Sequence, residues 1–151
     1  MLPPTLISAS VHARAYVLEE KTGSISLIKI VDTLWIEPDS DESEIRITVV
    51  VMLKFQPFEQ STHLIQLRGT YPSGETSDVG KPVTFDMGHE SFANGQPRGY
   101  HASGGVPIPT SELGTYYFSV LLDGEAVART PVTLIRRSTE GPAHSVSQAE
   151  L

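Results

Sequence analysis

The chain contains no cysteine, and no long run of hydrophobic residues interrupts its polar sequence. Without cysteine there is no disulfide framework, no thiolate metal site and no catalytic thiol. No apolar stretch approaches the roughly 18 residues that a membrane-spanning helix needs, so we expect no membrane partner. The first residues show neither the basic leader nor the apolar run of a secretory signal. These absences favour a cytoplasmic protein.

Basic residues are also scarce, because 11 Lys and Arg stand against 18 Asp and Glu and give a formal net charge of −7 at pH 7. A surface of this charge repels polyanions, and the basic residues are spread along the chain. We therefore expect no nucleic-acid partner. Its 151 residues, 39% of them hydrophobic, suit one domain with its own core. We assign residues 1–137 to that domain and residues 138–151 to a disordered tail, which has too few apolar residues to offset the entropy of ordering.

Alternation of apolar and polar residues predicts β-strands. In residues 44–55 every second side chain is apolar, as in a strand with one face in a core. Residues 26–36 are apolar at both parities, which predicts a central strand covered on both faces, with Trp35 in the core. The remaining expected strands cover residues 8–18, 62–71, 81–85, 100–108, 114–122 and 125–135.

Turn signals connect these strands. Asp123–Gly124 between two β-rich runs is a strong hairpin signal, because Gly tolerates the positive φ of a tight turn. Pro72 and Gly74 predict another turn directly after the strand that ends near Tyr71. No long amphipathic helix is visible. The pattern predicts an all-β fold, an immunoglobulin-like antiparallel β-sandwich of about seven to nine strands. Gly114–Tyr117 resembles a late strand of such domains, in which a Tyr hydroxyl bonds back to a nearby loop.

The middle of the chain is rich in glycine: eight of the 12 glycines lie between Gly69 and Gly105. This composition predicts turns and a long loop, and loops carry function more often than the elements they connect. We expect the surface of action to lie in the 86–105 loop or at a sheet edge. The candidate partner-binding or ligand-binding residues of the loop are His89, Glu90, Phe92, Arg98, Tyr100 and His101.

None of the possible chemical motifs is complete. Asp86, His89, Glu90 and His101 could ligate a divalent ion, but Ala93 stands where the helical zinc-protease motif needs its second His. His101 occupies the position where a nucleophile elbow around Ser103 needs Gly. The five carboxylates of residues 37–44 lack the Gly of an EF-hand loop and indicate a solvated connection.

Asp32 interrupts an apolar run, so it should be hydrogen-bonded, paired or near a sheet end. A single carboxylate supplies no mechanism. We therefore predict no catalytic residue, no metal site and no cofactor.

Three blocks of the sequence, taken in order, resemble a known family: Gly23–Asp32, Leu64–Glu75 and Gly114–Glu125. They are similar to a family of small bacterial β-sandwich proteins of unknown function, in which a Gly-x-x-Ser-Leu-like strand ending in Asp precedes a Pro-x-Gly turn and a closing Asp-Gly-Glu hairpin. The resemblance covers residues 10–136. It implies the fold and carries over no reaction, cofactor or catalytic residue.

Three functional hypotheses follow. The first is a non-catalytic interaction or structural module that binds another protein, or a second copy of itself, through a sheet edge or the 86–105 loop. The second is a small-ligand or carbohydrate binder that would use aromatic residues near loops, namely Tyr71, Phe92 and Tyr100. The third is a metal-dependent hydrolase that would use His89, Glu90 and His101.

Overall fold

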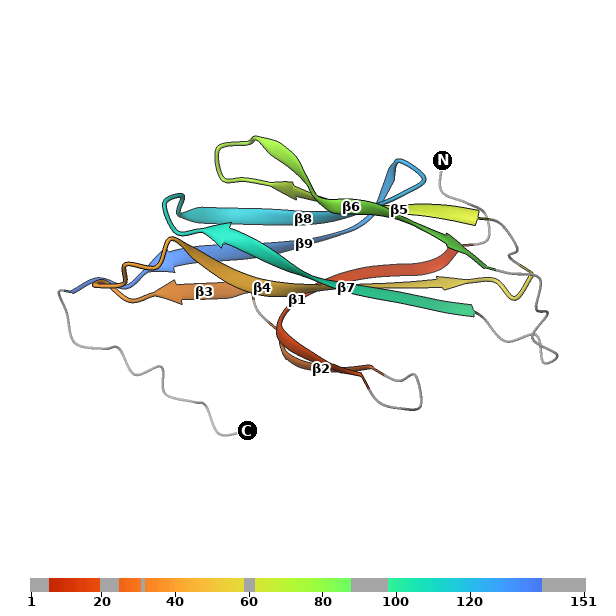
Figure 1. The fold of residues 1–151 in the computed structure, drawn as a ribbon, viewed down its shortest axis with the longest axis horizontal. Helices are drawn as coiled ribbons and strands as arrows, with labels where there is room; N and C mark the ends of the chain where they lie inside the picture. The colour runs from red at the N-terminus through yellow and green to blue at the C-terminus, as the bar shows by residue number, and fades with distance from the viewer. Residues whose placement is uncertain (1–5, 20–24, 31, 59–61, 88–97, 140–151) are drawn as a thin grey trace.

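The computed structural model describes residues 6–19, 25–30, 32–58, 62–87 and 98–139, and these residues form nine strands and no helix (Figure 1). The prediction of an all-β fold is confirmed. No helix in these ranges could cross a membrane. The strands are β1 (Leu6–Glu19), β2 (Ile25–Ile30), β3 (Thr33–Ile36), β4 (Glu44–Phe55), β5 (Thr62–Thr70), β6 (Thr76–Asp86), β7 (Arg98–Pro109), β8 (Gly114–Leu122) and β9 (Glu125–Arg136).

The strands form two sheets that contribute to one core. One sheet has the order β2-β1-β4-β7 and the other the order β3-β9-β8-β5-β6, with β3 and β9 parallel. Alternation places one row of each strand inward. On β4 this row includes Val49 and Val51, and on β8 it includes Phe118 and Val120, all buried in one cluster. The predicted strand 44–55 is confirmed with the same bounds.

Both predicted turns are confirmed. At the β8–β9 hairpin Asp123 has φ 51° and Gly124 has φ 87°, the pair of positive values that a tight turn between twisted strands requires. After β5, the amide of Gly74 (φ 91°) donates to the Tyr71 carbonyl oxygen at 2.9 Å. The first predicted strand is likewise present as β1.

The prediction of one central strand over residues 26–36 is wrong. This stretch forms β2 and β3, which are end strands of different sheets. The apolar run belongs to two short strands, β2 and β3, that follow each other in the sequence. The alternation of inward and outward residues therefore does not continue from one strand into the next. The exposed Asp32 lies there, and its carbonyl oxygen accepts from the Thr133 amide at 2.8 Å. Trp35 was predicted in the core and is instead 54% exposed, because Ile36 takes the inward position of β3.

The predicted strand over residues 100–108 is confirmed as part of β7, so the predicted 86–105 loop does not extend over residues 98–105. Glycine lowers strand propensity, yet the continuous pairing of β7 with β4 overrides it. Residues 88–97 lie outside the described residues, as do 140–151 of the predicted tail.

Tyr116 ties the start of β8 to the turn before it. Its hydroxyl donates to the Glu112 carbonyl oxygen at 2.6 Å and lies 3.3 Å from the Pro109 carbonyl oxygen. The ring packs edge-on against Tyr71 at 5.6 Å. Burial, with smaller contributions from Glu112 and Tyr71, raises the pKa of Tyr116 from 10.0 to about 12.

We predict an alkaline stability difference between the wild type and Tyr116→Phe. A folded-state pKa of about 12 lies above the ordinary value of 10.0, so the contribution of Tyr116 is complete below pH 10 and is lost as the pH rises through 12. Over this pH range the wild type should lose about 2–3 kcal/mol of its free energy of unfolding. Urea unfolding at rising pH should show the wild type losing stability more steeply than the variant. Parallel curves would contradict the role of Tyr116.

We also predict that Gly114→Ala destabilises the fold. Gly114 has φ 128°, and a Cβ at this position would lie 2.9 Å from the Pro72 Cβ. The strained backbone and the clash together should cost about 1–3 kcal/mol in urea unfolding. Gly104→Ala is the matched control, because a Cβ there meets no atom within 4 Å. Equal stability of the two variants would be inconsistent with the assigned constraint.

Candidate functional site

The two sides of the core differ. On one side β1 of the first sheet packs against β9 of the second. On the other side the sheets end in β7 and β6, and these end strands are not hydrogen-bonded to each other. Two cavities lie between them, and we call this region the β6–β7 cleft. It is the candidate functional site.

The larger cavity has a volume of about 220 Å³ and an apolar floor. Its floor comes from both sheets, and Val83 on its rim is 46% exposed. Among the 13 residues that line it, Lys81 alone is charged. The lining residues on which the argument depends are Val49, Val51, Ile65, Lys81, Gly104 and Val106.

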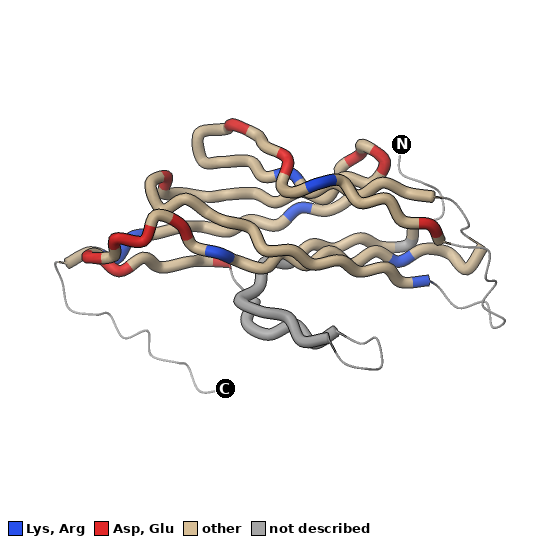
Figure 2. The backbone as a smooth tube through the Cα atoms, in the orientation of Figure 1, with Lys and Arg blue, Asp and Glu red and all other residues tan. Residues whose placement is uncertain are grey.

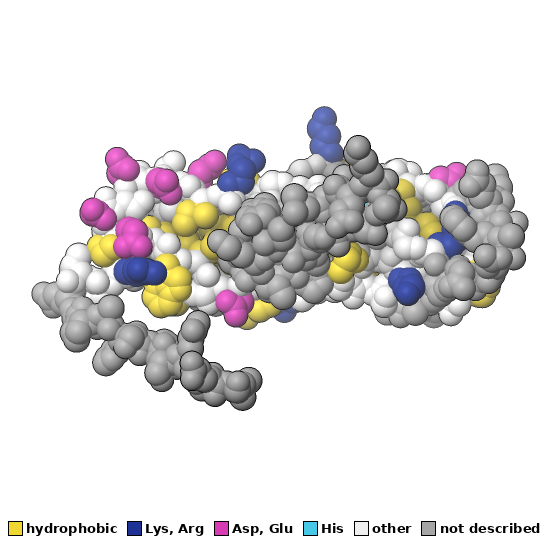
Figure 3. Space-filling view, turned by 90° about the horizontal axis from the view of Figure 1, so that it is seen from below, with side chains coloured by type: hydrophobic (Ala, Val, Ile, Leu, Met, Phe, Trp, Pro, Cys, Tyr) yellow, Lys and Arg dark blue, Asp and Glu magenta, His cyan; other side chains and the backbone are white. Residues whose placement is uncertain are grey.

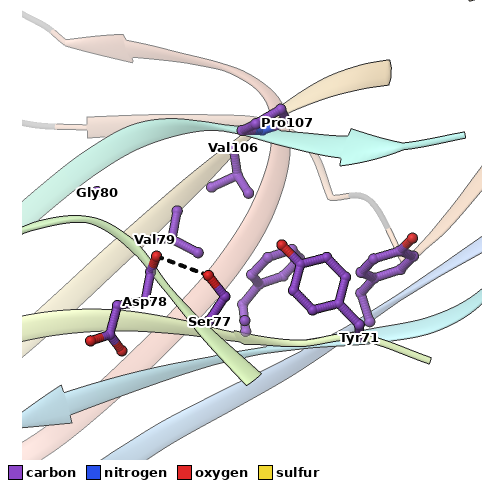
Figure 4. A pocket seen from close by; sticks show the side chains of 10 residues that line it. Tyr71, Ser77, Asp78, Val79, Gly80, Val106 and Pro107 are labelled. Carbon is purple, nitrogen blue, oxygen red and sulfur yellow. Dashed lines mark hydrogen bonds between the residues drawn. The ribbon is translucent and has the colours of Figure 1, made fainter. Parts of the chain in front are cut away.

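The second cavity, of about 190 Å³, adjoins the first, because Val79, Gly80 and Val106 line both. Figure 4 shows the Val106 side chain of β7 directed toward Val79 of β6. The Asp78 carboxylate at its rim forms an ion pair with Arg68, with Oδ1 and Nε 3.0 Å apart. The cleft is therefore mainly apolar. The smaller cavity has the Asp78 carboxylate, which is paired with Arg68, and the larger cavity has Lys81.

Gly104 keeps the larger cavity open. It pairs with Val49 across the β4–β7 ladder and so belongs to the inward row of β7, with Ala102 opposite Val51 and Val106 opposite Ile47. A Cβ built on Gly104 would meet no atom within 4 Å. A Cβ at this position therefore has open space beside the cavity that Gly104 lines.

Acidic residues gather elsewhere. The connection from Glu37 to Glu44 lies at the end of the molecule near the start of β4, where red segments cluster in Figure 2. Its residues are mostly exposed, as predicted for a solvated connection. No group of His and acidic side chains suited to a metal ion occurs in the described ranges.

Three of the six predicted site residues lie on β7, and the structure separates them. Tyr100 takes an inward position and stacks on Phe85, with ring centroids 4.0 Å apart. His101 is exposed on the opposite face of the strand, and Arg98 is the first residue of β7. His89, Glu90 and Phe92 lie outside the described residues. Alternation along β7 thus keeps Tyr100 and His101 from forming one site.

His63 and Asp123 form a buried link that sequence patterns do not predict. His63 is 5% exposed, and its Nδ1 donates to Asp123 Oδ2 at 2.7 Å. The other carboxylate oxygen accepts from the Leu64 amide at 2.9 Å. The His63 ring stacks on Phe55 at 4.9 Å. This geometry fastens the β8–β9 turn to the start of β5, which is a structural role.

Trp35 and Ile135 form a second exposed apolar pair. They are register partners of β3 and β9 and are 54% and 37% exposed. Arg137 lies 5.7 Å from the Trp35 ring centroid and forms an ion pair with Glu37 at 3.4 Å. Figure 3 shows exposed hydrophobic side chains among acidic and basic ones at the end where these strands lie.

Sequence patterns predicted a strand over residues 100–108 but did not predict the cleft beside it. The alternation of Tyr100, Ala102, Gly104, Val106 and Ile108 was the available signal, since all five occupy one face of a strand. Because Ala102 and Gly104 are small, the alternation of apolar and polar residues does not identify these five residues as the inward row of β7. The cavity itself depends on which strands end each sheet, and that follows from topology.

No family model matches this chain, and no curated protein matches it. Among solved structures it is similar to the Pseudomonas fluorescens alkylpurine DNA glycosylase AlkC bound to DNA containing an abasic site analog, with a TM-score of 0.38 and 13% identity. The match covers 84% of this chain and 30% of that chain. At this TM-score the likeness carries no argument on fold or function.

The prediction of no nucleic-acid partner requires correction. The neighbour named above is bound to DNA, so the exclusion is withdrawn, and a TM-score of 0.38 carries no argument for a nucleic-acid partner of this chain in its place. The physical reason is that a formal charge of −7 describes the whole surface, whereas nucleic-acid binding depends on local basic patches. Net charge alone did not justify the exclusion.

We predict that Asp123→Gly destabilises the protein through its lost side chain. Glycine keeps the positive φ of the turn, but the Leu64 amide and the buried His63 Nδ1 lose their acceptor. Leaving such donors unsatisfied costs about 1–3 kcal/mol in urea unfolding. Asp123→Asn retains one side-chain oxygen and should cost less. An unchanged stability of Asp123→Gly would refute the link.

Proposed function

We propose that this protein is a non-catalytic interaction module that binds an extended segment of another protein at the β6–β7 cleft. The observation that carries the proposal is the coincidence of two apolar cavities with the free edges of two strands. A strand edge offers unpaired backbone N–H and C=O groups, which can bind an extended chain whatever its sequence. The cavities beside the edge would select which side chains that chain carries.

We further propose that the fold is an immunoglobulin-like sandwich. Three features support this assignment. Both sheets contribute to one buried cluster, the parallel β3–β9 pair edges the second sheet, and the Tyr116 hydroxyl bonds back to the turn before β8. In such a sandwich each sheet presents two edges, and pairing within the described ranges leaves β6 and β7 as neighbouring edges.

The chemistry of the cleft favours binding over catalysis. The larger cavity presents Lys81 as its charged side chain, and the smaller presents Asp78, already paired with Arg68. Catalysis needs a nucleophile or an acid and base held within reach of each other. The lining of the cleft supplies apolar area and edge hydrogen bonds instead, which suit recognition of a chain.

We predict that Gly104→Leu abolishes partner binding without unfolding the protein. The leucine side chain would occupy the larger cavity, where a Cβ meets no atom within 4 Å. Tagged wild type, Gly104→Leu and Gly99→Ala should be compared in affinity capture from the native host, with thermal unfolding of each. Gly99 pairs with Lys54 on the outward row of the same strand and is the matched control.

A partner retained by the wild type and Gly99→Ala but lost by Gly104→Leu would support the proposal. Equal retention by all three proteins would place binding elsewhere. If no protein is retained and a small apolar compound raises the unfolding temperature of the wild type and Gly99→Ala but not of Gly104→Leu, the cleft is a ligand site and the proposal fails.

A further inference from the structure

The two strands that border the cleft differ in their capacity to accept another strand. On β6, Gly80 has φ 69°, Pro82 has no N–H group, and residues 80–82 face Gln66 alone between the pairs Val79–Leu67 and Val83–Ile65. A bulge and a proline protect an edge from further pairing. The edge of β6 is therefore interrupted beside the larger cavity.

The edge of β7 is continuous there. Its pairing with β4 runs without a register shift from Arg98 to Pro109, and the first proline is Pro107. Along residues 102–106, which line the larger cavity, every second residue directs its backbone N–H and C=O groups away from β4, so an extended chain can pair with β7 there. We therefore assign β7, and not β6, as the strand that accepts the partner.

The cavities then fix the spacing of the side chains. Gly104 lines the larger cavity, and Val106, two residues further along the same inward row, lines both. An added strand also directs every second side chain inward, about 6.6–6.8 Å apart. An apolar cavity of about 150 Å³ accepts a molecule the size of benzene. Volumes of about 220 and 190 Å³ therefore accept one large aliphatic or aromatic side chain each.

Charge specifies a third feature of the occupant. Lys81 lines the larger cavity and forms no ion pair with another residue of the described ranges. A partner carboxylate beside the first apolar side chain would complement it at short range, where the cleft contains no competing unpaired acid. A basic side chain at the same place would meet the lysine and be rejected.

From these observations we infer that the occupant of the cleft is an acidic, extended segment of a partner protein that adds to the edge of β7. Two large apolar side chains, two residues apart, fill the cavities, and a carboxylate next to the first pairs with Lys81. This inference rests on the proposed function and names the chemistry of the partner. A second copy of the chain is the competing occupant.

The test is selection of random short peptides, displayed on phage, against the full-length protein. Wild type, Gly104→Leu, Lys81→Glu and Gly99→Ala serve as targets. Peptides from the wild type should show two apolar residues separated by one, next to Asp or Glu. A synthetic peptide of the selected sequence should bind Lys81→Glu about tenfold more weakly, and replacing its acid by Lys should restore binding to that variant. Gly99→Ala should bind as the wild type does.

The outcomes separate the two proposals. If no peptide is enriched on the wild type over Gly104→Leu, with Gly104→Val as a second filled variant, the proposed function fails. If enrichment depends on Gly104 but shows no acidic preference and no response to Lys81→Glu, strand addition stands and the acidic partner is wrong. If sedimentation shows a dimer that Gly104→Leu dissociates, a second copy occupies the cleft and the inference is overturned.

Discussion

The structure depends on burial between the inward rows of β4 and β8. Each of these strands lies inside its own sheet, with a paired neighbour on both sides. Val49 of β4 and Val120 and Leu122 of β8 are almost fully buried. Burial of one such side chain stabilises a fold by about 1.5–3 kcal/mol. The inward rows of β4 and β8 therefore hold the two sheets together without any contribution from the strands at the sheet edges. The flanking strands can therefore differ: β1 packs against β9 at one side, and a cleft separates β7 from β6 at the other.

Specific bonds at both ends of the molecule set the walls of that cleft. At one end, the Thr110 hydroxyl at the end of β7 donates to the Glu42 carbonyl oxygen at 2.5 Å, and Tyr116 anchors the following turn. At the other end, Phe85 of β6 stacks on Tyr100 of β7, beside His63. Between these ends the sheet edges are left apart. A cleft held in this way loses little conformational entropy when a partner binds, which favours affinity.

Sequence patterns predicted the parts of this fold that depend on local chemistry. Strong alternation located β4, and the Asp123–Gly124 pair located the last hairpin, because turn conformation is fixed by the residues in the turn. The error over residues 26–36 has the opposite cause. Those two segments are short strands in separate sheets, and the point where a chain leaves one sheet for another depends on long-range pairing with β1 and β9.

The candidate site was harder to predict because its defining residues carry no chemical signature. His101 and Glu90 drew attention as titratable groups, whereas Gly104 and Val79 form a site only through their positions on the end strands of two sheets. Asp123 was predicted as a turn residue, and its bond to His63 joins residues 60 positions apart. Such a contact cannot be read from local pattern, since it depends on the register of β5 against β8.

Gly104 is an unfavourable residue for its place in β7, which indicates that the cleft is not a simple packing defect. A glycine inside a strand costs about 0.5–1 kcal/mol relative to alanine, and a β-branched residue would suit both the strand and the apolar floor. Its φ is not positive, and a Cβ has open space, so neither backbone conformation nor crowding requires glycine here. At Gly114, by contrast, both do. Neither backbone conformation nor crowding of a Cβ explains the glycine at position 104, and its missing side chain leaves the apolar space beside β7 unfilled.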